Sequence, residues 1–291
     1  MKILLFFIDG LGLNEKNSNS NMNPFFKAKT PVFDSLFPND LGLVVPTDLS
    51  QGISGIPQSA TGQTALLTGK NAAKAMGRHK SGFPGPTLKK IIRQHNIFNK
   101  LKKLNVDCTF ANAYTTKYVN EIKKEKRRGS VTTYSVLNSD LGFRYVEDIK
   151  KNKAVYQDFT NNILIEKGFN LKQLSPCDAA KNLISIIERH DFTLYEYFQS
   201  DIIGHSQDIK KAIEVLEGLD KFINTLLNKI NNHVLIIITS DHGNIEDLSI
   251  KTHSKNNVPT FLIGPHKNYA ADNINKIEDV TPTIIDIFKR F

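Results

Sequence analysis

The chain alternates between short apolar runs and longer segments in which apolar residues recur every three or four positions. The apolar runs predict buried strands at residues 2–9, 42–48, 106–114, 192–201, 234–241 and 258–264. The segments with helical spacing predict helices at residues 30–38, 86–104, 175–190, 209–230 and 279–290, with a further helix beginning near Thr64. This order predicts an α/β fold, a three-layer sandwich around a mostly parallel central sheet.

Two stretches lack a clear period. Residues 14–30 are rich in Asn and Ser and are expected to form a loop. Residues 116 to about 165 contain the basic patch KKEKRR at 123–128 and are expected to form a small inserted cap. A length of 291 residues with 40% hydrophobic content suits one large core. We therefore expect a single domain over residues 1–291.

Charge and cysteine content narrow the class of protein. The net charge of +9 is carried by patches and dispersed lysines without interleaved aromatic residues, so a solvated basic face is favoured over a nucleic-acid surface. Such a face favours a small anionic substrate such as a phosphate. Cys108 and Cys177 are isolated and are expected to be ordinary thiols in the cytoplasm. The first apolar run ends at Asp9 after only six residues, so it predicts a strand rather than a secretory signal, and no segment predicts a membrane span.

Acidic and imidazole side chains follow three of the predicted strands. They are Asp9, Asp201 with His205 four residues later, Asp241 with His242, and His253 in the next loop. A single Asp-His pair could equally cap a helix or face water. Open α/β folds, however, bind ligands at the carboxyl ends of their strands, and gathered carboxylates repel one another unless a cation holds them. Asp and His donors without thiolate suit zinc or manganese, and a pair of ions about 3.5–4 Å apart serves phosphoryl transfer.

The segment SATGQTALLTG contains hydroxyl side chains that are candidates for a nucleophile. Ser59, Thr61 and Thr64 are the candidates. Thr64 is favoured because a helix is expected to begin there, and a helix N-terminus attracts a phosphate. The alternative is that Thr64 only caps this helix. The nearby segment 77–85 adds Arg78, which either binds an anion or lies in a solvated turn.

The motifs FIDG, GQT, SDxxGH, SDHGN and THS, between residues 9 and 253, resemble the metal-binding motifs of the alkaline phosphatase superfamily. They are most similar to the branch with cofactor-independent phosphoglycerate mutase, phosphopentomutase and the nucleotide pyrophosphatase/phosphodiesterases. The resemblance implies an alkaline phosphatase-like fold, Thr64 as the nucleophile and Gln63 as a phosphate contact. It implies two divalent ions, one held by Asp201, His205 and His253, and the other by Asp9, Asp241, His242 and the Thr64 oxygen.

These residues predict a metal-dependent phosphatase or phosphodiesterase that acts through a phosphothreonine. The mutases of the branch carry a large inserted domain that keeps water from the phosphoenzyme, and the smaller insert expected here favours hydrolysis. A phosphomutase acting on a small phosphorylated metabolite is the alternative. A non-catalytic metal- or nucleic-acid-binding protein carries less weight. The Cys-x-Pro-x-Arg loop of sulfatases is missing, which argues against that activity. Ester class, choice between zinc and manganese, and oligomeric state stay open.

Overall fold

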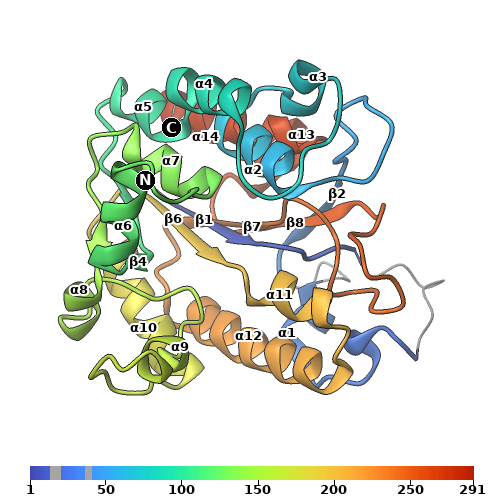
Figure 1. Cartoon of the computed structure of the whole chain (residues 1–291), viewed down its shortest axis with the longest axis vertical. Helices are drawn as coiled ribbons and strands as arrows, with labels where there is room; N and C mark the ends of the chain where they lie inside the picture. The colour runs from blue at the N-terminus through green and yellow to red at the C-terminus, as the bar shows by residue number, and fades with distance from the viewer. Residues whose placement is uncertain (14–20, 37–40) are drawn as a thin grey trace.

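The computed structural model describes residues 1–13, 21–36 and 41–291 (Figure 1). Parts of the expected loop at 14–30 and of the expected helix at 30–38 therefore lie outside the described residues. None of the helices within the described ranges is long and apolar enough to cross a membrane.

A six-stranded sheet forms the centre of the molecule. In spatial order its strands are β2 (Leu43–Thr47), β8 (Val258–Ile263), β7 (Val234–Thr239), β1 (Lys2–Ile8), β6 (Phe192–Tyr197) and β3 (Cys108–Phe110). Strands β7, β1, β6 and β3 are parallel, whereas β8 is antiparallel to both of its neighbours. All residues of β1, β6 and β7 except Lys2 are buried, as expected for central strands covered on both faces.

Helices cover both faces of the sheet (Figure 1). Side chains alternate along β1, so Leu4 and Phe6 pack into one hydrophobic cluster and Leu5 and Phe7 into another. The first cluster is covered by α1 (Pro31–Leu36), α10 (Pro176–Ile187) and α12 (Ile209–Lys229). The second is covered by α2 (Ser59–Thr68), α4 (Pro86–His95), α5 (Ile97–Lys102), α13 (Lys267–Asn273) and α14 (Val280–Arg290). The predicted three-layer α/β sandwich is confirmed.

Three predicted elements away from α2 have other bounds in the structure. The helix expected at 86–104 is two helices, because Asn96 adopts extended backbone and its side chain caps α5 by accepting from the Asn99 amide. The strand expected at 106–114 is divided into β3 and the short β4 (Ala113–Tyr114). The strand expected at 192–201 ends at Tyr197, and α11 (Gln199–Ser206) follows directly.

The segment expected to form a cap contains short elements. They are β5 (Arg144–Tyr145), which pairs with β4, and the helices α6 (Thr116–Lys123), α7 (Val131–Leu137), α8 (Val146–Lys150) and α9 (Asn162–Glu166). A small hydrophobic cluster around Ala113, Val146 and Leu164 holds part of it together. Helix α7 packs against α2 and α4 of the main body. Its role as a cap over a substrate stays a prediction.

Candidate metal centre

Two neighbouring parallel strands place three of the predicted ligands. Asp9 follows β1, and Asp241 and His242 follow β7, which pairs with β1 directly. We call Asp9, Asp241 and His242 the strand-end set. Their ligand atoms lie within 4.8 Å of one another, with Asp9 Oδ1 3.2 Å and Asp241 Oδ2 3.6 Å from His242 Nε2. All three residues are buried.

The other three predicted ligands come from a helix and a loop. Asp201 and His205 lie on α11, four residues apart on one face, rather than at the end of a strand. His253 lies in the loop before β8. We call Asp201, His205 and His253 the helix–loop set. Asp201 Oδ1 lies 3.5 Å from His205 Nε2 and 3.6 Å from His253 Nε2, and the two Nε2 atoms are 3.2 Å apart.

Backbone carbonyl groups orient both imidazoles of the helix–loop set. His205 Nδ1 lies 3.2 Å from the Lys251 oxygen, and His253 Nδ1 lies 3.1 Å from the Pro57 oxygen. An Nδ1–H that donates to a carbonyl leaves the Nε2 lone pair for a metal ion. Both Nε2 atoms point toward Asp201, so this arrangement fits a cation between the three side chains.

Unpaired buried oxygens give an independent test of the strand-end set. Asp9 Oδ1 and both carboxylate oxygens of Asp241 are buried without a hydrogen-bond partner among the described residues. His242 Nε2 approaches two of these oxygens, at 3.2 Å and 3.6 Å, but one imidazole nitrogen carries at most one hydrogen, and buried carboxylate oxygens without a hydrogen bond are costly, so a cation would satisfy what His242 cannot. The residues present therefore fit a divalent ion here as well. His242 links the two sets, since its Nδ1 lies 3.9 Å from Asp201 Oδ1 and its ring stacks on that of His253.

Electrostatics within the centre reflect burial and crowded charge. Burial, together with the charge of Asp9, raises the pKa of the Asp241 carboxyl well above its usual range. Burial lowers the pKa of His242, but the carboxylates of Asp241 and Asp9 outweigh this and raise it to about 10. Burial and the neighbouring charge of His242 lower the pKa of His253 to about 4. The three buried groups of the strand-end set thus shift one another's pKa values, and a cation bound between them would favour the ionised carboxylates and the neutral imidazole.

The structure does not place Thr64 at a helix start. Helix α2 begins at Ser59, so Thr64 lies in its second turn, fully buried, and its hydroxyl donates to the Ala60 carbonyl at 2.6 Å. Ser59 is the first residue of α2, and its Oγ lies 3.0 Å from His242 Nε2. The hydroxyl that reaches the strand-end set is therefore that of Ser59. Gly62 and two β-branched threonines weaken the helical pattern of this segment, which hides the true start.

The two predicted substrate contacts lie in different surroundings. Gln63 is buried, and its side-chain amide donates to Asp9 Oδ2 at 3.1 Å, so it contacts a candidate ligand directly. Arg78 is exposed in the turn after α3 (Ala72–Met76). Its contact with a substrate stays a prediction.

The comparison with protein families decides the assignment. The model of the Metalloenzyme superfamily matches residues 1–290. The chain belongs to this superfamily. The predicted resemblance to this group of metalloenzymes is confirmed by the family match, and the structural neighbours described below share an alkaline phosphatase-like fold.

Proteins with similar sequences include 2,3-bisphosphoglycerate-independent phosphoglycerate mutases. The enzyme of Metamycoplasma hominis is 30% identical over 136 residues, which cover 44% of this chain and 27% of the relative. The enzyme of Ehrlichia canis is 28% identical over 210 residues, covering 64% of this chain and 39% of the relative. The matches thus span well under half of the length of these mutases.

Solved structures of alkaline phosphatases share the fold. The alkaline phosphatase of the Antarctic bacterium TAB5 has a TM-score of 0.55 and 14% identity, and covers 99% of this chain and 98% of its own. That of a psychrophilic Shewanella has a TM-score of 0.56 and 12% identity, with 99% and 100% coverage. A protein from Pyrococcus horikoshii reaches a TM-score of 0.61 at 16% identity, with 100% and 97% coverage.

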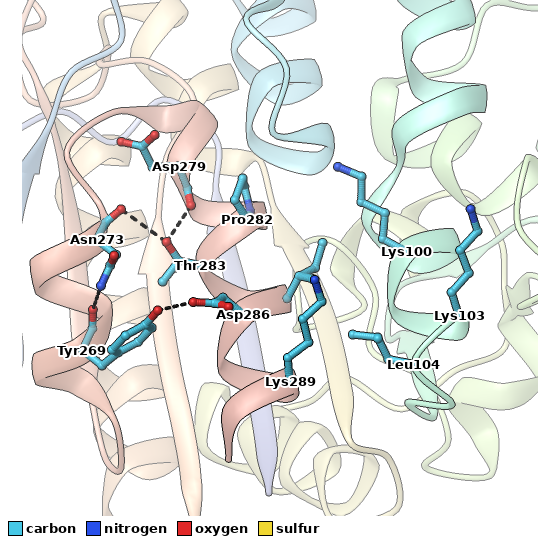
Figure 2. Close-up of a pocket in the computed structure, with 11 residues that line it drawn as sticks. Lys100, Lys103, Leu104, Tyr269, Asn273, Asp279, Pro282, Thr283, Asp286 and Lys289 are labelled. Atoms are coloured by element: carbon cyan, nitrogen blue, oxygen red, sulfur yellow. Dashed lines mark hydrogen bonds between the residues drawn. The ribbon is translucent and has the colours of Figure 1, made fainter.

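A separate cavity of about 670 Å³ lies between α5, α13 and α14 (Figure 2). Lys100, Lys103 and Lys289 line it, and the Asp286 carboxylate in its wall accepts from the Tyr269 hydroxyl. None of the predicted site residues lines this cavity. It is therefore distinct from the candidate metal centre.

Proposed function

We propose that the protein is a metal-dependent hydrolase of a small phosphate ester, with Ser59 as its nucleophile. The observation that carries this proposal is the position of Ser59 Oγ, 3.0 Å from His242 Nε2 and beside the strand-end set. We propose Ser59 instead of Thr64, the nucleophile predicted from the sequence, because the Thr64 hydroxyl donates a hydrogen bond to the Ala60 carbonyl within α2. The six predicted ligands keep their proposed roles, in two sites that meet at His242.

The beginning of α2 supports binding of a phosphate group next to Ser59. The first amides of a helix have no intrahelical acceptor, and the helix dipole favours an anion at this end. The N-cap residue Gln58 makes no side-chain capping bond, which is consistent with a first turn that receives a ligand. A phosphate placed there would lie between Ser59 and the two ligand sets.

Divalent ions bound at the two sites would supply positive charge for the phosphate oxygens and lower the pKa of a nearby hydroxyl. In the proposed reaction, Ser59 Oγ forms a bond to phosphorus while the bond to the leaving ester oxygen breaks, and the proton of Ser59 passes through solvent to that oxygen, which leaves as an alcohol. A phosphoserine results. Water then forms a bond to phosphorus, the bond to Ser59 Oγ breaks, and inorganic phosphate leaves. Gln63 holds the Asp9 carboxylate in place through its amide.

A phosphomutase is the second candidate, because the curated relatives are phosphoglycerate mutases. In that reaction the phosphoserine returns its phosphoryl group to another hydroxyl of the same substrate. Hydrolysis is favoured here because residues 116–165 form only short helices and a small hydrophobic cluster rather than a large inserted domain. The accumulation of an isomer without free phosphate would favour the mutase.

The remaining features of the proposal follow from the sequence. The two ions are zinc or manganese, because Asp and His donors suit both. The substrate is a small phosphorylated metabolite, Arg78 is a candidate contact for it, and the protein acts in the cytoplasm as a single domain with a cap at about 116–165.

The test is the release of nitrophenol from mono- and bis-nitrophenyl phosphate. Metal-stripped protein is assayed after addition of zinc or manganese, beside Ser59→Ala and Thr64→Val. We expect metal-dependent turnover that Ser59→Ala abolishes, because the attacking oxygen is removed. Thr64→Val keeps the shape of the buried side chain and should retain turnover.

Two results would contradict this assignment. Turnover that persists in Ser59→Ala and disappears in Thr64→Val, with both variants folded and metal-bound, would restore Thr64 as the nucleophile. Absence of turnover with both esters, together with isomerisation of a phosphoglycerate or phosphosugar, would replace the hydrolase with the mutase.

A further inference from the structure

We infer that Glu246 is a positioning residue that holds the helix–loop set in its binding geometry. Glu246 is fully buried in the loop that follows β7. It has no role predicted from the sequence, and it belongs to neither ligand set. This inference rests on the proposed function, because it concerns the same metal ions.

The Glu246 carboxylate accepts hydrogen bonds from the loop after β1 and from both ends of its own long connection between β7 and β8. Oε2 accepts from the Gly12 amide at 3.0 Å and from the Asn244 amide at 2.8 Å. Oε1 accepts from the Ser254 hydroxyl and from the Asn256 side-chain amide at 3.1 Å. Four donors satisfy a buried carboxylate, and bonds to a charged acceptor are the stronger kind.

Three of these four bonds lead toward a candidate ligand. Asn244, whose backbone amide Glu246 holds, donates from its own side chain to Asp201 Oδ1 at 2.6 Å. Ser254 directly follows His253 in the chain. Gly12 lies in the loop that begins at Asp9. Glu246 therefore reaches two members of the helix–loop set through one intermediate residue each.

Close packing fixes the carboxylate against two glycines. A Cβ added at Gly12 would overlap the Glu246 carboxylate, and one added at Gly243 would overlap both this carboxylate and Ser254 Oγ. A side chain at either position would have to displace Glu246. Such tight placement is what a positioning group requires, because side chains held by packing and hydrogen bonds keep ligands in place.

The two ligand sets should depend on Glu246 to different degrees. Asp241 and His242 follow the buried strand β7, which the sheet holds on both sides. Asp201 and His253 lie on a short helix and a loop, and both are reached through the Glu246 bonds. Removal of the carboxylate should therefore weaken the ion at the helix–loop set more than the ion at the strand-end set, near which Glu246 holds only the Gly12 and Asn244 backbone amides beyond the ends of β1 and β7.

The experiment is calorimetric titration of the metal-stripped protein with manganese chloride. Glu246→Ala removes all four bonds. Glu246→Gln keeps an oxygen for the Gly12 and Asn244 amides, and its amide group can donate to Ser254 Oγ. Asp220→Ala is the matched control, because Asp220 is also buried and accepts from two backbone amides, those of Val32 and Phe33, at the start of α1.

We expect two ions to bind to the unchanged protein and to Asp220→Ala with similar affinities. In Glu246→Ala one ion should bind about 10- to 100-fold more weakly, as for other losses of groups that orient ligands, while the other is retained. Glu246→Gln should recover most of the loss. Equal weakening in Asp220→Ala would show a general effect of lost stability and overturn the inference, as would unchanged binding of both ions in Glu246→Ala.

Binding and turnover separate this inference from the proposed function. If both ions bind and Glu246→Ala weakens one of them, but no phosphate ester is cleaved, the positioning role stands and the hydrolase falls. If esters are cleaved and Glu246→Ala binds both ions normally, the hydrolase stands and the positioning role falls. If the unchanged protein binds no divalent ion, both fall.

Discussion

The two ligand sets are built in opposite ways. The strand-end set follows two central strands, and the side chains of Asp241 and His242 are 0% exposed. In the helix–loop set, the side chain of His205 is 43% exposed and that of Asp201 is 17% exposed. The side chain of His253, in the same set, is only 6% exposed. The strand-end set is therefore enclosed, whereas the helix–loop set opens to solvent on the side of His205.

This difference in burial predicts that the two sets bind their ions with different affinities. Buried carboxylates without partners gain most from a cation, so the strand-end set should hold its ion tightly. Side chains on a short helix and a loop can adjust at lower cost, so the helix–loop set should bind more weakly and admit solvent. Ser59 lies on the strand-end side, which places the proposed nucleophile beside the more rigid half.

The largest effect on turnover is expected from Asp241→Asn, which removes a negatively charged candidate ligand from the strand-end set. The amide cannot replace a negatively charged ligand, so turnover should fall by at least about 10²-fold. Burial and the Asp9 charge raise the pKa of Asp241, so the charged form is costly in the metal-free protein. The metal-free variant should therefore melt at a higher temperature than the unchanged protein.

Turnover assays and thermal melting, each with and without metal, check both parts of this prediction. Circular dichroism confirms that the variant is folded. Lower melting of the metal-free variant, or nearly unchanged turnover, would show that the buried charge of Asp241 is not reserved for an ion.

A smaller effect is expected from His205→Ala, which breaks the open half. Loss of this half-exposed ligand should weaken one ion about 10- to 100-fold and leave the other bound. Excess manganese should restore part of the turnover, because the site keeps Asp201 and His253. The measurement is turnover against metal concentration. If excess metal restored turnover in Asp241→Asn but not in His205→Ala, the helix–loop set rather than the strand-end set would be the tighter ion site.

The strand-end set is the part of the centre that sequence predicts best. Apolar runs followed directly by Asp9 and by Asp241 with His242 define both the strand and its end, and the sheet brings these ends together. The helix–loop set is predicted in composition but not in placement. Asp201 is expected at the end of a strand, whereas the structure has it on α11, because a run such as FQSD carries no clear signal of a change from strand to helix.

The proposed nucleophile and the proposed positioning residue show where inference from sequence stops. The spacing of hydroxyls in SATGQT does not tell which one faces the candidate ligands, and Thr64 is predicted from a helix start that the structure moves to Ser59. Glu246 has no local signal, because its bond to Gly12 joins residues that are distant in the sequence, and its bond to Ser254 depends on how the long β7–β8 connection folds back on itself. Such contacts depend on the packed fold rather than on any period or motif.

A smaller effect, on stability, is expected from Glu196→Gln. Glu196 lies on β6, which pairs with β1, the strand that Asp9 follows. Burial raises the pKa of Glu196 to about 8, although the Thr132 hydroxyl donates to it, and the Asp9 charge adds to the rise. Because the folded protein favours the protonated form of Glu196, this side chain adds to the free energy of unfolding. The contribution is complete below the pKa of the carboxyl in the unfolded chain, about 4.3, and is lost as the pH rises through about 8. The unchanged protein should therefore lose stability across this window.

Denaturant unfolding of the metal-free protein at several pH values measures this loss. Glu196→Gln does not titrate, so its profile across the window should be flatter than that of the unchanged protein. Parallel profiles for the two proteins would show that Glu196 is ionised in the folded state.

The smallest effects are expected from a matched pair of glycine substitutions inside helices. A Cβ added at Gly62 in α2 would lie 2.5 Å from the Asp241 backbone oxygen, whereas one added at Gly218 in α12 would lie 3.8 Å from Phe159 Cζ. Alanine normally stabilises a helix interior by roughly 0.5–1 kcal/mol relative to glycine. Gly218→Ala should show this gain in denaturant unfolding, and Gly62→Ala should lose stability instead.

The sign of the Gly62 effect is the informative result, because α2 carries Ser59 and presses on Asp241 at the same time. Displacement of α2 should also weaken the ion at the strand-end set, and it should leave the ion at the helix–loop set bound. If Gly62→Ala is as stable as Gly218→Ala and binds both ions normally, α2 can shift away from Asp241 at little cost. The enclosed half of the centre would then be less rigid than its burial indicates.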